Sequence, residues 1–179
     1  SLVSRPGARD AWDIILRRVP ASRGGSAYIH EHLQAGDTLA AGWPGNLFAP
    51  VRTARRHLMI AGGIGITPFL SYLAEFGFTG AGHALHVCCR ETEKDAFAPW
   101  LGGRSGVAFH WDADGHRLDI PALLAAQPAG THLYVCGPAA MNDEVMGAAA
   151  AAGWPASHVH CEHFGSALSG GEAFRAFLA

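Results

Sequence analysis

Short apolar runs alternate with helix-like segments from residue 57 onward. Five of the runs predict buried strands, at 57–61, 84–89, 107–111, 131–136 and 158–162. The segments between them predict helices at 67–76, 93–101, 119–126 and 139–152. Strands and helices that alternate at this spacing are typical of a parallel sheet covered on both faces. We therefore expect an α/β fold with a doubly wound parallel five-stranded sheet.

The pattern before residue 57 is different. Residues 11–19 and 36–44 predict strands, and a glycine turn followed by a short helix lies between them. The character of the sequence changes near 49–58. This change indicates a boundary between a small β unit and the α/β domain.

Composition and charge exclude several classes of partner. The 179 residues are 49% hydrophobic, which suffices for one domain and part of another. Thirteen basic and fifteen acidic residues give a net charge of -2, so nothing favours nucleic acid or an anionic membrane. No apolar run reaches about 18 residues, and the N-terminus does not follow the order of a signal peptide. The four cysteines have no C-x-x-C spacing and resemble buried thiols of a reducing compartment, which predicts a cytoplasmic protein.

A glycine-rich loop follows the first predicted strand of the sheet. In parallel sheets, ligands bind beyond the carboxyl ends of the strands. The stretch HLMIAGGIGITPFL (57–70) places Gly62, Gly63 and Gly65 there, where backbone N–H groups and the next helix N-terminus favour an anion such as a phosphate. However, Pro68 stands where the G-x-G-x-x-G fingerprint requires its third glycine. A tight turn without a ligand is the alternative.

Two further places follow predicted strands. Cys136 ends one strand and precedes Gly137 and Pro138, so its thiol either faces the same crevice or packs in the core. Arg90 and Glu91 follow the second strand. An acid there accepts from adenine-ribose hydroxyls and repels a 2'-phosphate, although charges after a strand are also simply solvated.

Four segments together resemble the ferredoxin reductase superfamily, and within it the reductases of Rieske-type oxygenases. They are RGGSAYIHEHLQAGDTL, GGIGITPFLSYL, LYVCGPAAMNDEV and VHCEHFG, in the family's order and near its spacing. The resemblance implies an antiparallel FMN-binding barrel, an NADH-binding domain and a 2Fe-2S ferredoxin domain. We accordingly expect part of the barrel at 1–52, the NAD-binding domain at 53–165, and a linker with the first ferredoxin strand at 166–179.

The C-x4-C-x2-C cluster ligands do not occur in this sequence. The resemblance therefore places the 2Fe-2S cluster outside this chain, in a missing C-terminal domain or a partner, and makes the chain a fragment of a longer reductase.

The resemblance assigns seven residues to FMN: Ser1, Leu16, Arg17, Arg18, Gly24, Gly25 and Ser26. The first corresponds to the end of the family's Arg-x-Tyr-Ser flavin motif, the next three flank the ring or phosphate, and 24–26 form the phosphate loop. Exposed N–H groups, a hydroxyl and a helix start suit a phosphate there. The FAD-binding branch differs at this loop, so FMN is favoured over FAD.

The resemblance assigns a second set to NADH and hydride transfer. It comprises the loop glycines Gly62, Gly63 and Gly65, the catalytic residues Thr67, Cys136 and Glu162, and Arg90, Glu91, Gly137, Pro138, Met141 and Phe164. Thr67 lies against flavin and nicotinamide, Glu162 is an acid near the reacting atoms, and Phe164 stacks on the isoalloxazine. Glu91 favours NADH over NADPH, although the family motif has Asp there in some members.

The implied activity is hydride transfer from NADH to FMN, followed by one-electron transfer toward a 2Fe-2S centre and a Rieske-type terminal oxygenase of the monooxygenase or demethylase kind. A nucleotide-binding module without flavin activity is the alternative. A zinc site in HVHCEH is not expected. Strand alternation puts His158 and His160 on one face and Cys161 and His163 on the other.

Overall fold

The chain forms two compact units, which are described separately. A computed structural model describes residues 1–18, 24–40, 42, 45–111, 115–164 and 177–178. The larger unit comprises 1–15 with 48–165, and the smaller comprises 16–47 with 166–179.

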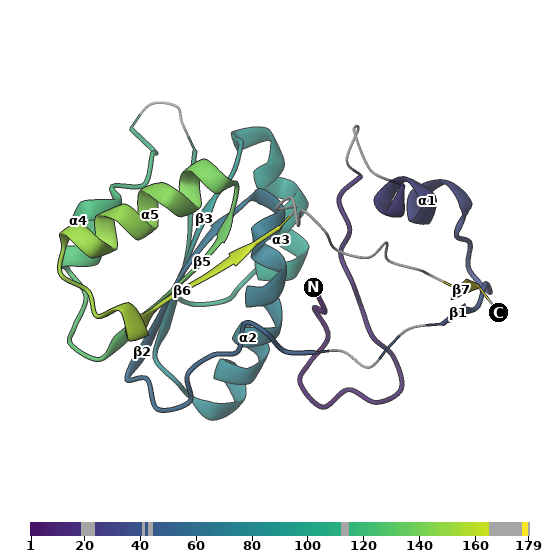
Figure 1. The fold of residues 1–179 in the computed structure, drawn as a ribbon, viewed down its shortest axis with the longest axis horizontal. Helices are drawn as coiled ribbons and strands as arrows, with labels where there is room; N and C mark the ends of the chain where they lie inside the picture. Colours follow the sequence, from purple (N-terminus) through teal and green to yellow (C-terminus); the bar gives the residue numbers. More distant parts are fainter. Residues whose placement is uncertain (19–23, 41, 43–44, 112–114, 165–176, 179) are drawn as a thin grey trace. The chain divides into compact units, whose positions relative to one another are not determined.

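The larger unit is built on a five-stranded parallel sheet with the order β4-β3-β2-β5-β6 (Figure 1). The strands are β2 (Arg56–Gly62), β3 (His83–Cys88), β4 (Val107–His110), β5 (Thr131–Gly137) and β6 (Val159–His163). The chain runs outward from β2 to one edge, then returns to β5 beside β2 and runs to the other edge. The predicted α/β class is thereby confirmed, and the point where strand order reverses lies between β2 and β5.

Helices connect the strands of this unit. They are α2 (Thr67–Thr79), α3 (Lys94–Leu101), α4 (Ile120–Ala125) and α5 (Ala139–Ala151), with the 3₁₀ turns η1 (Gly63–Ile66), η2 (Glu91–Glu93) and η3 (Ala156–His158). α2 ends where Gly80 adopts the left-handed conformation with φ of 70°. Asp119 caps the N-terminus of α4, and its carboxylate accepts from the backbone N–H of Ala122 at 3.0 Å. Within the described ranges, none of the helices is long and apolar enough to cross a membrane.

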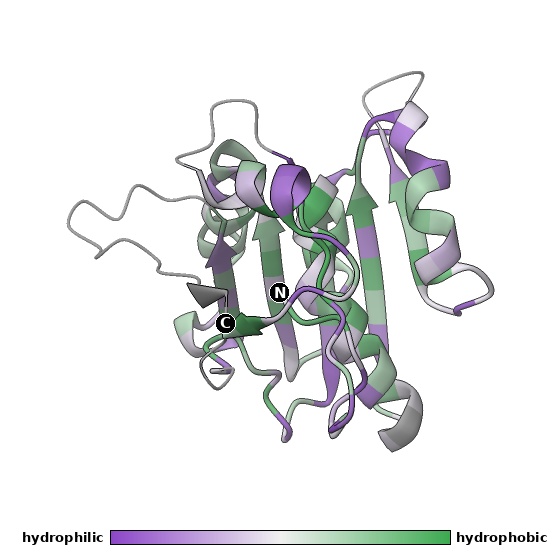
Figure 2. Cartoon of the chain, turned by 90° about the vertical axis from the view of Figure 1, so that its right-hand side faces the viewer, coloured by the Kyte–Doolittle hydropathy of each residue, from purple (hydrophilic) through white to green (hydrophobic). Residues whose placement is uncertain are grey.

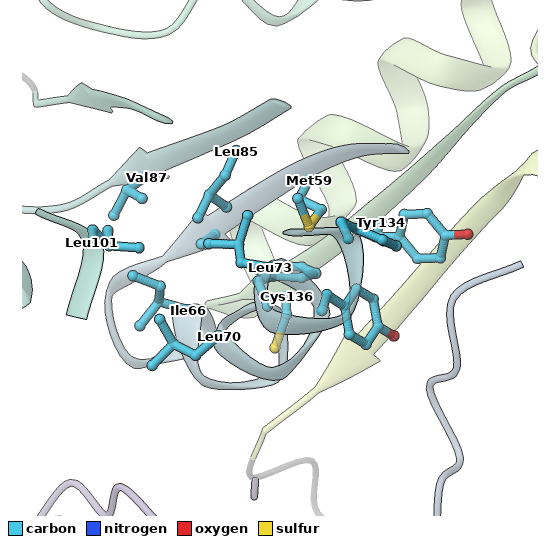
Figure 3. Packing of buried hydrophobic residues seen from close by; sticks show 13 residues of the cluster. Met59, Ile66, Leu70, Leu73, Leu85, Val87, Leu101, Tyr134 and Cys136 are labelled. Atoms are coloured by element: carbon cyan, nitrogen blue, oxygen red, sulfur yellow. The ribbon is translucent and has the colours of Figure 1, made fainter. Parts of the chain in front are cut away.

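The sheet is apolar on both faces, because alternate residues of each central strand enter different cores. On one face Met59 and Leu85 pack against Leu73 and other residues of α2 (Figure 3). On the other face Leu58 and Leu133 pack against α4 and α5. Hydrophobic residues accordingly dominate the central strands in Figure 2. This continuous burial explains why the apolar runs predicted these strands.

The smaller unit contains α1 (Gly25–His32), β1 (Leu39–Ala40) and β7 (Phe177–Leu178), and β1 pairs with β7 antiparallel. The strand predicted at 36–44 is thus reduced to two described residues. The strand predicted at 11–19 is wrong over 11–18, where only Ile14 forms an isolated bridge, with Leu2. Extended segments become strands only where a neighbour pairs with their N–H and C=O groups. Most of the predicted ferredoxin strand lies outside the described residues.

Candidate functional site

The carboxyl ends of β2 and β5 lie side by side where the strand order reverses. Ala61 pairs with Cys136 in the parallel ladder, so both chains leave the sheet at the same level. After β2 the chain forms η1 and then α2, and after β5 it passes through Pro138 into α5. Crevices at this point bind ligands in open α/β sheets.

The two loops at this point are in close contact. A Cβ atom on Gly65 would overlap the backbone carbonyl of Cys136. A Cβ atom on Gly62 would lie 2.5 Å from Pro138 Cδ and 2.9 Å from Met141 Cε. Glycine is therefore required at both positions by packing, and the structure brings the two sequence motifs together as predicted from strand order.

The loop after β2 leads directly into α2. Gly63 has a φ of 52°, and a Cβ atom there would meet no atom within 4 Å. Thr67 is only 1% exposed, and its hydroxyl donates to the carbonyl of Ile64 at 3.1 Å. The hydroxyl proton is thus engaged within its own turn. Its predicted contact with flavin and nicotinamide stays a prediction.

Cys136 and Glu162 form a pair across β5 and β6. They are register partners, and the Cys136 thiol donates to Glu162 Oε2 at 3.9 Å. Burial, and then the neighbouring carboxylate, raise the pKa of Cys136 to about 12. Burial also raises the pKa of Glu162. The thiol therefore remains protonated at neutral pH and cannot act as a nucleophile.

Asn142 is a buried residue of the site that the sequence analysis missed. It is fully buried, and its Nδ2 donates to the carbonyl of Glu162 at 3.2 Å and contacts His163 Nδ1 at 3.3 Å. It fastens the end of β6 to the first turns of α5. Its spacing from Val145 and Ala149 on the buried stripe of α5 is the signal that could have identified it.

The remaining predicted residues near this edge differ in exposure. A Cβ atom on Gly137 would overlap Met141 Cε, so the methionine fills the space between the loops. Phe164 follows β6 with 39% of its surface exposed. Ser1 is exposed as well.

Charged groups gather after β3. Arg90 and Glu91 are both exposed. The backbone N–H of Arg90 donates to the carboxylate of Glu93 at 3.2 Å, so Glu93 caps the η2 turn. The Lys94 ammonium lies 5.2 Å from the centre of the Trp111 ring.

The smaller unit holds the other predicted residues. Arg18 pairs with Glu31 of α1 at 2.6 Å, and the carbonyl of Leu16 lies 3.2 Å from His30 Nε2. α1 begins after Gly24, whose φ is 117°. The segment that carries Leu16, Arg17 and Arg18 is thus tied to the helix that starts with Gly25 and Ser26.

The structure corrects the expectation that all four cysteines are buried thiols. Of the four cysteines, only Cys136 is buried, because Cys88, Cys89 and Cys161 lie at strand ends or on an edge strand and are partly exposed. In the part of the chain that the structure describes, no three His, Cys, Asp or Glu side chains converge as metal ligands.

Comparison with known sequences identifies a family and relatives that align with the whole of this chain. Residues 45–159 match the family described as dimethylamine monooxygenase subunit DmmA-like, N-terminal domain. The chain is 41% identical over 180 residues to the heme-dependent oxidative N-demethylase beta subunit of Ectopseudomonas mendocina (strain ymp), covering 100% of this chain and 58% of that protein. It is 41% identical over 182 residues to the carnitine monooxygenase reductase subunit of Escherichia coli (strain K12), covering 100% and 57%. The chain thus spans little more than half the length of these relatives.

Comparison with solved structures agrees with the fold. Phthalate dioxygenase reductase, described as a modular structure for electron transfer from pyridine nucleotides to a 2Fe-2S centre, superposes with a TM-score of 0.84 at 31% identity. The alignment covers 94% of this chain and 54% of that one.

Proposed function

Because the chain belongs to the DmmA-like N-terminal domain family of dimethylamine monooxygenase subunits, we propose that it is the nucleotide-binding part of an NADH-dependent flavin reductase that serves an oxygenase. The resemblance predicted from the four sequence segments is confirmed, since the similar proteins are named as reductase or demethylase subunits and include phthalate dioxygenase reductase. The observation that carries the proposal is the contact of Gly65 with the backbone of Cys136 at the reversal of strand order.

The residues of the larger unit fit a dinucleotide. In the loop of Gly62, Gly63 and Gly65, the two outer glycines pack against the β5–α5 loop, and Gly63 has open space beside it, where its backbone and the start of α2 suit a pyrophosphate. Glu91 is placed after β3 to accept from ribose hydroxyls, which supports NADH over NADPH. The Cys136 thiol is buried beneath this loop and donates to Glu162, so it supports the end of β5 as an uncharged group at pH 7.

The residues of the smaller unit fit the phosphate of FMN. Gly24 and Gly25 are exposed at the start of α1, where the partial positive charge of a helix end favours an anion. Arg18 forms an ion pair with Glu31 in the last turn of the same helix, which ties the cation to α1. Bound FMN would supply an acceptor that takes up a hydride and passes electrons on singly. In the larger unit, Phe164 has an exposed ring that is suited to aromatic stacking.

We assign the remaining parts by the same family. The domain limits are 1–52 for the flavin barrel, 53–165 for the NAD-binding domain and 166–179 for a linker into a ferredoxin domain. The 2Fe-2S cluster belongs to that further domain or to a partner, and the electrons leave toward a Rieske-type terminal oxygenase. Names such as oxidative N-demethylase and carnitine monooxygenase support an oxygenase or demethylase partner. The free thiols support a cytoplasmic location.

An absorbance spectrum of the purified chain tests the reductase proposal. The expected result is a bound yellow chromophore that NADH bleaches in the absence of oxygen. A chain that binds NADH but carries no chromophore, even after incubation with FMN, would instead support a nucleotide-binding module without flavin activity. Of the described residues in the strand predicted at 36–44, only Leu39–Ala40 are in a strand, and this favours the second candidate.

A further inference from the structure

Two pairs of histidines link each edge strand of the sheet to its inner neighbour. His132 Nδ1 of β5 lies 3.0 Å from His160 Nε2 of β6. His86 Nδ1 of β3 lies 2.9 Å from His110 Nε2 of β4. In the described sheet, β6 and β4 are the two edge strands. Each edge is therefore tied by one imidazole pair.

The two rings of each pair face each other through their nitrogens. In the His132–His160 pair the ring centres are 5.3 Å apart and the planes differ by 9°. In the His86–His110 pair these values are 5.1 Å and 23°. In each pair, the distance between the two nitrogens is shorter than the distance between the ring centres by about the sum of the two ring radii. The two nitrogens therefore lie close to the line that joins the ring centres. A metal ion does not fit between nitrogens this close and collinear.

This arrangement requires one shared proton. A neutral imidazole has one N–H donor and one lone-pair acceptor, whereas a charged imidazole has two donors and no acceptor. When one ring directs its N–H at the lone pair of the other ring, the two imidazoles form a hydrogen bond. If both rings are charged, two N–H groups face each other and two positive charges repel.

The surroundings of the His132–His160 pair oppose its protonation. The ring of His158 lies 4.1 Å from that of His132, and the ring of Tyr134 lies 4.7 Å from that of His160. Burial, and then His158, lower the pKa of both members. Four titratable side chains surround the pair: His158 on η3, His57 on β2, Tyr134 on β5 and Tyr72 on α2. Beyond the pair on β6, Glu162 is bonded to Cys136.

The His86–His110 pair is similarly situated. Burial, His110 and the cation of Arg56 on β2 lower the pKa of His86 to about 4. Burial lowers the pKa of His110, while the backbone of His116 opposes this shift and its ring adds to it. Neither pair is therefore charged at neutral pH.

We propose that these two histidine pairs are acid-sensitive latches, which hold β4 and β6 onto the sheet at neutral pH and release them when both rings of a pair are protonated. Because β6 carries Glu162, release of this strand also separates the Cys136–Glu162 pair of the candidate site. The latch depends only on the sheet and not on the proposed function. Because the pKa values of these histidines are lowered in the folded sheet, the folded edges bind fewer protons than the released edges. The protection of the edge-strand amides from hydrogen exchange therefore falls as pH falls.

Hydrogen exchange of the full chain at pH 7.5 and pH 5, corrected for the intrinsic pH dependence of exchange, tests the latches. We expect the amides of β4 and β6 to lose about tenfold or more in protection at the lower pH, because the released imidazoles bind protons that the folded pairs do not bind. His160→Gln should remove the loss in β6 and leave it in β4. His110→Gln should do the reverse, and His32→Gln on α1 should change neither.

A β6 loss that persists undiminished in His160→Gln, or a β4 loss that persists undiminished in His110→Gln, would overturn the proposal. If a variant does not fold, nitrogen NMR of the wild-type imidazoles decides instead. The latches require one N–H between the rings of each pair at pH 7.5, and joint titration of the pair below pH 6.5. Two members that titrate independently at ordinary values exclude them.

Discussion

At the scale of single residues, Gly65 and Asn142 determine how the two motifs of the site meet. Gly65 allows the loop after β2 to touch the backbone of Cys136, and Asn142 fastens the end of β6 to α5. Neither residue needs a bound cofactor to do this. Both roles are therefore testable by stability alone.

We expect Gly65→Ala to lower the free energy of unfolding by about 3 kcal/mol or more, because the new Cβ atom overlaps a backbone carbonyl that no rotamer change can move. Gly77→Ala is the matched control. Gly77 lies within α2 with open space around it, so alanine there should stabilise by roughly 0.5–1 kcal/mol. Urea unfolding measures both. Similar effects of the two substitutions would refute the close contact.

We expect Asn142→Asp to destabilise by about 2–3 kcal/mol, because it replaces two buried N–H donors with an acceptor that faces the carbonyl of Glu162. Asp143→Asn, on the exposed neighbouring position, should change stability by less than about 0.5 kcal/mol. Chemical denaturation at pH 7.5 compares them. A nearly neutral Asn142→Asp would show that the fastening contributes little.

At the scale of elements, the strands of the sheet are predictable and the contacts between them are not. The central strands are buried on both faces, so apolar runs such as 57–61 and 131–136 identify them within two residues of β2 and β5. A segment such as 11–19 has an apolar pattern, but its state depends on a neighbour that the pattern does not specify. Asn142 and the histidine pairs were missed for the same reason, because their partners follow from register and helix packing. The predicted cofactor contacts stay predictions.

The packing of β2 against α2 makes stability depend on pH. His57 is 2% exposed and stacks on Phe76 with ring centres 4.1 Å apart. Burial, then His132 and His83, lower the pKa of His57 from 6.5 to about 4. The folded state thus binds this proton less readily than the unfolded state, so stability is full above pH 6.5 and falls toward pH 4.

We expect this single group to remove at most about 3 kcal/mol between pH 7 and pH 4. His57→Phe keeps an aromatic ring beside Phe76 and should flatten the dependence of unfolding free energy on pH. His30→Phe, on the exposed surface of α1, is the control. An unchanged slope in His57→Phe would show that His57 is not the group responsible.

At the scale of the whole molecule, the parallel sheet that reverses its strand order between β2 and β5 belongs to a chain of the DmmA-like N-terminal domain family of dimethylamine monooxygenase subunits. The chain covers 58% and 57% of two such relatives and 54% of phthalate dioxygenase reductase. The electron exit and the partner therefore belong to the proposal, whereas nucleotide binding depends on residues that the larger unit contains.

Backbone amide NMR of the isotopically labelled chain, titrated with NADH, tests whether the nucleotide binds where the two loops meet. Saturating NADH should shift the amides of residues 62–67, 136–137 and 139–142 in these loops, with further shifts at 90–91. Shifts confined to other parts of the sheet, or none at millimolar NADH, would contradict this binding site.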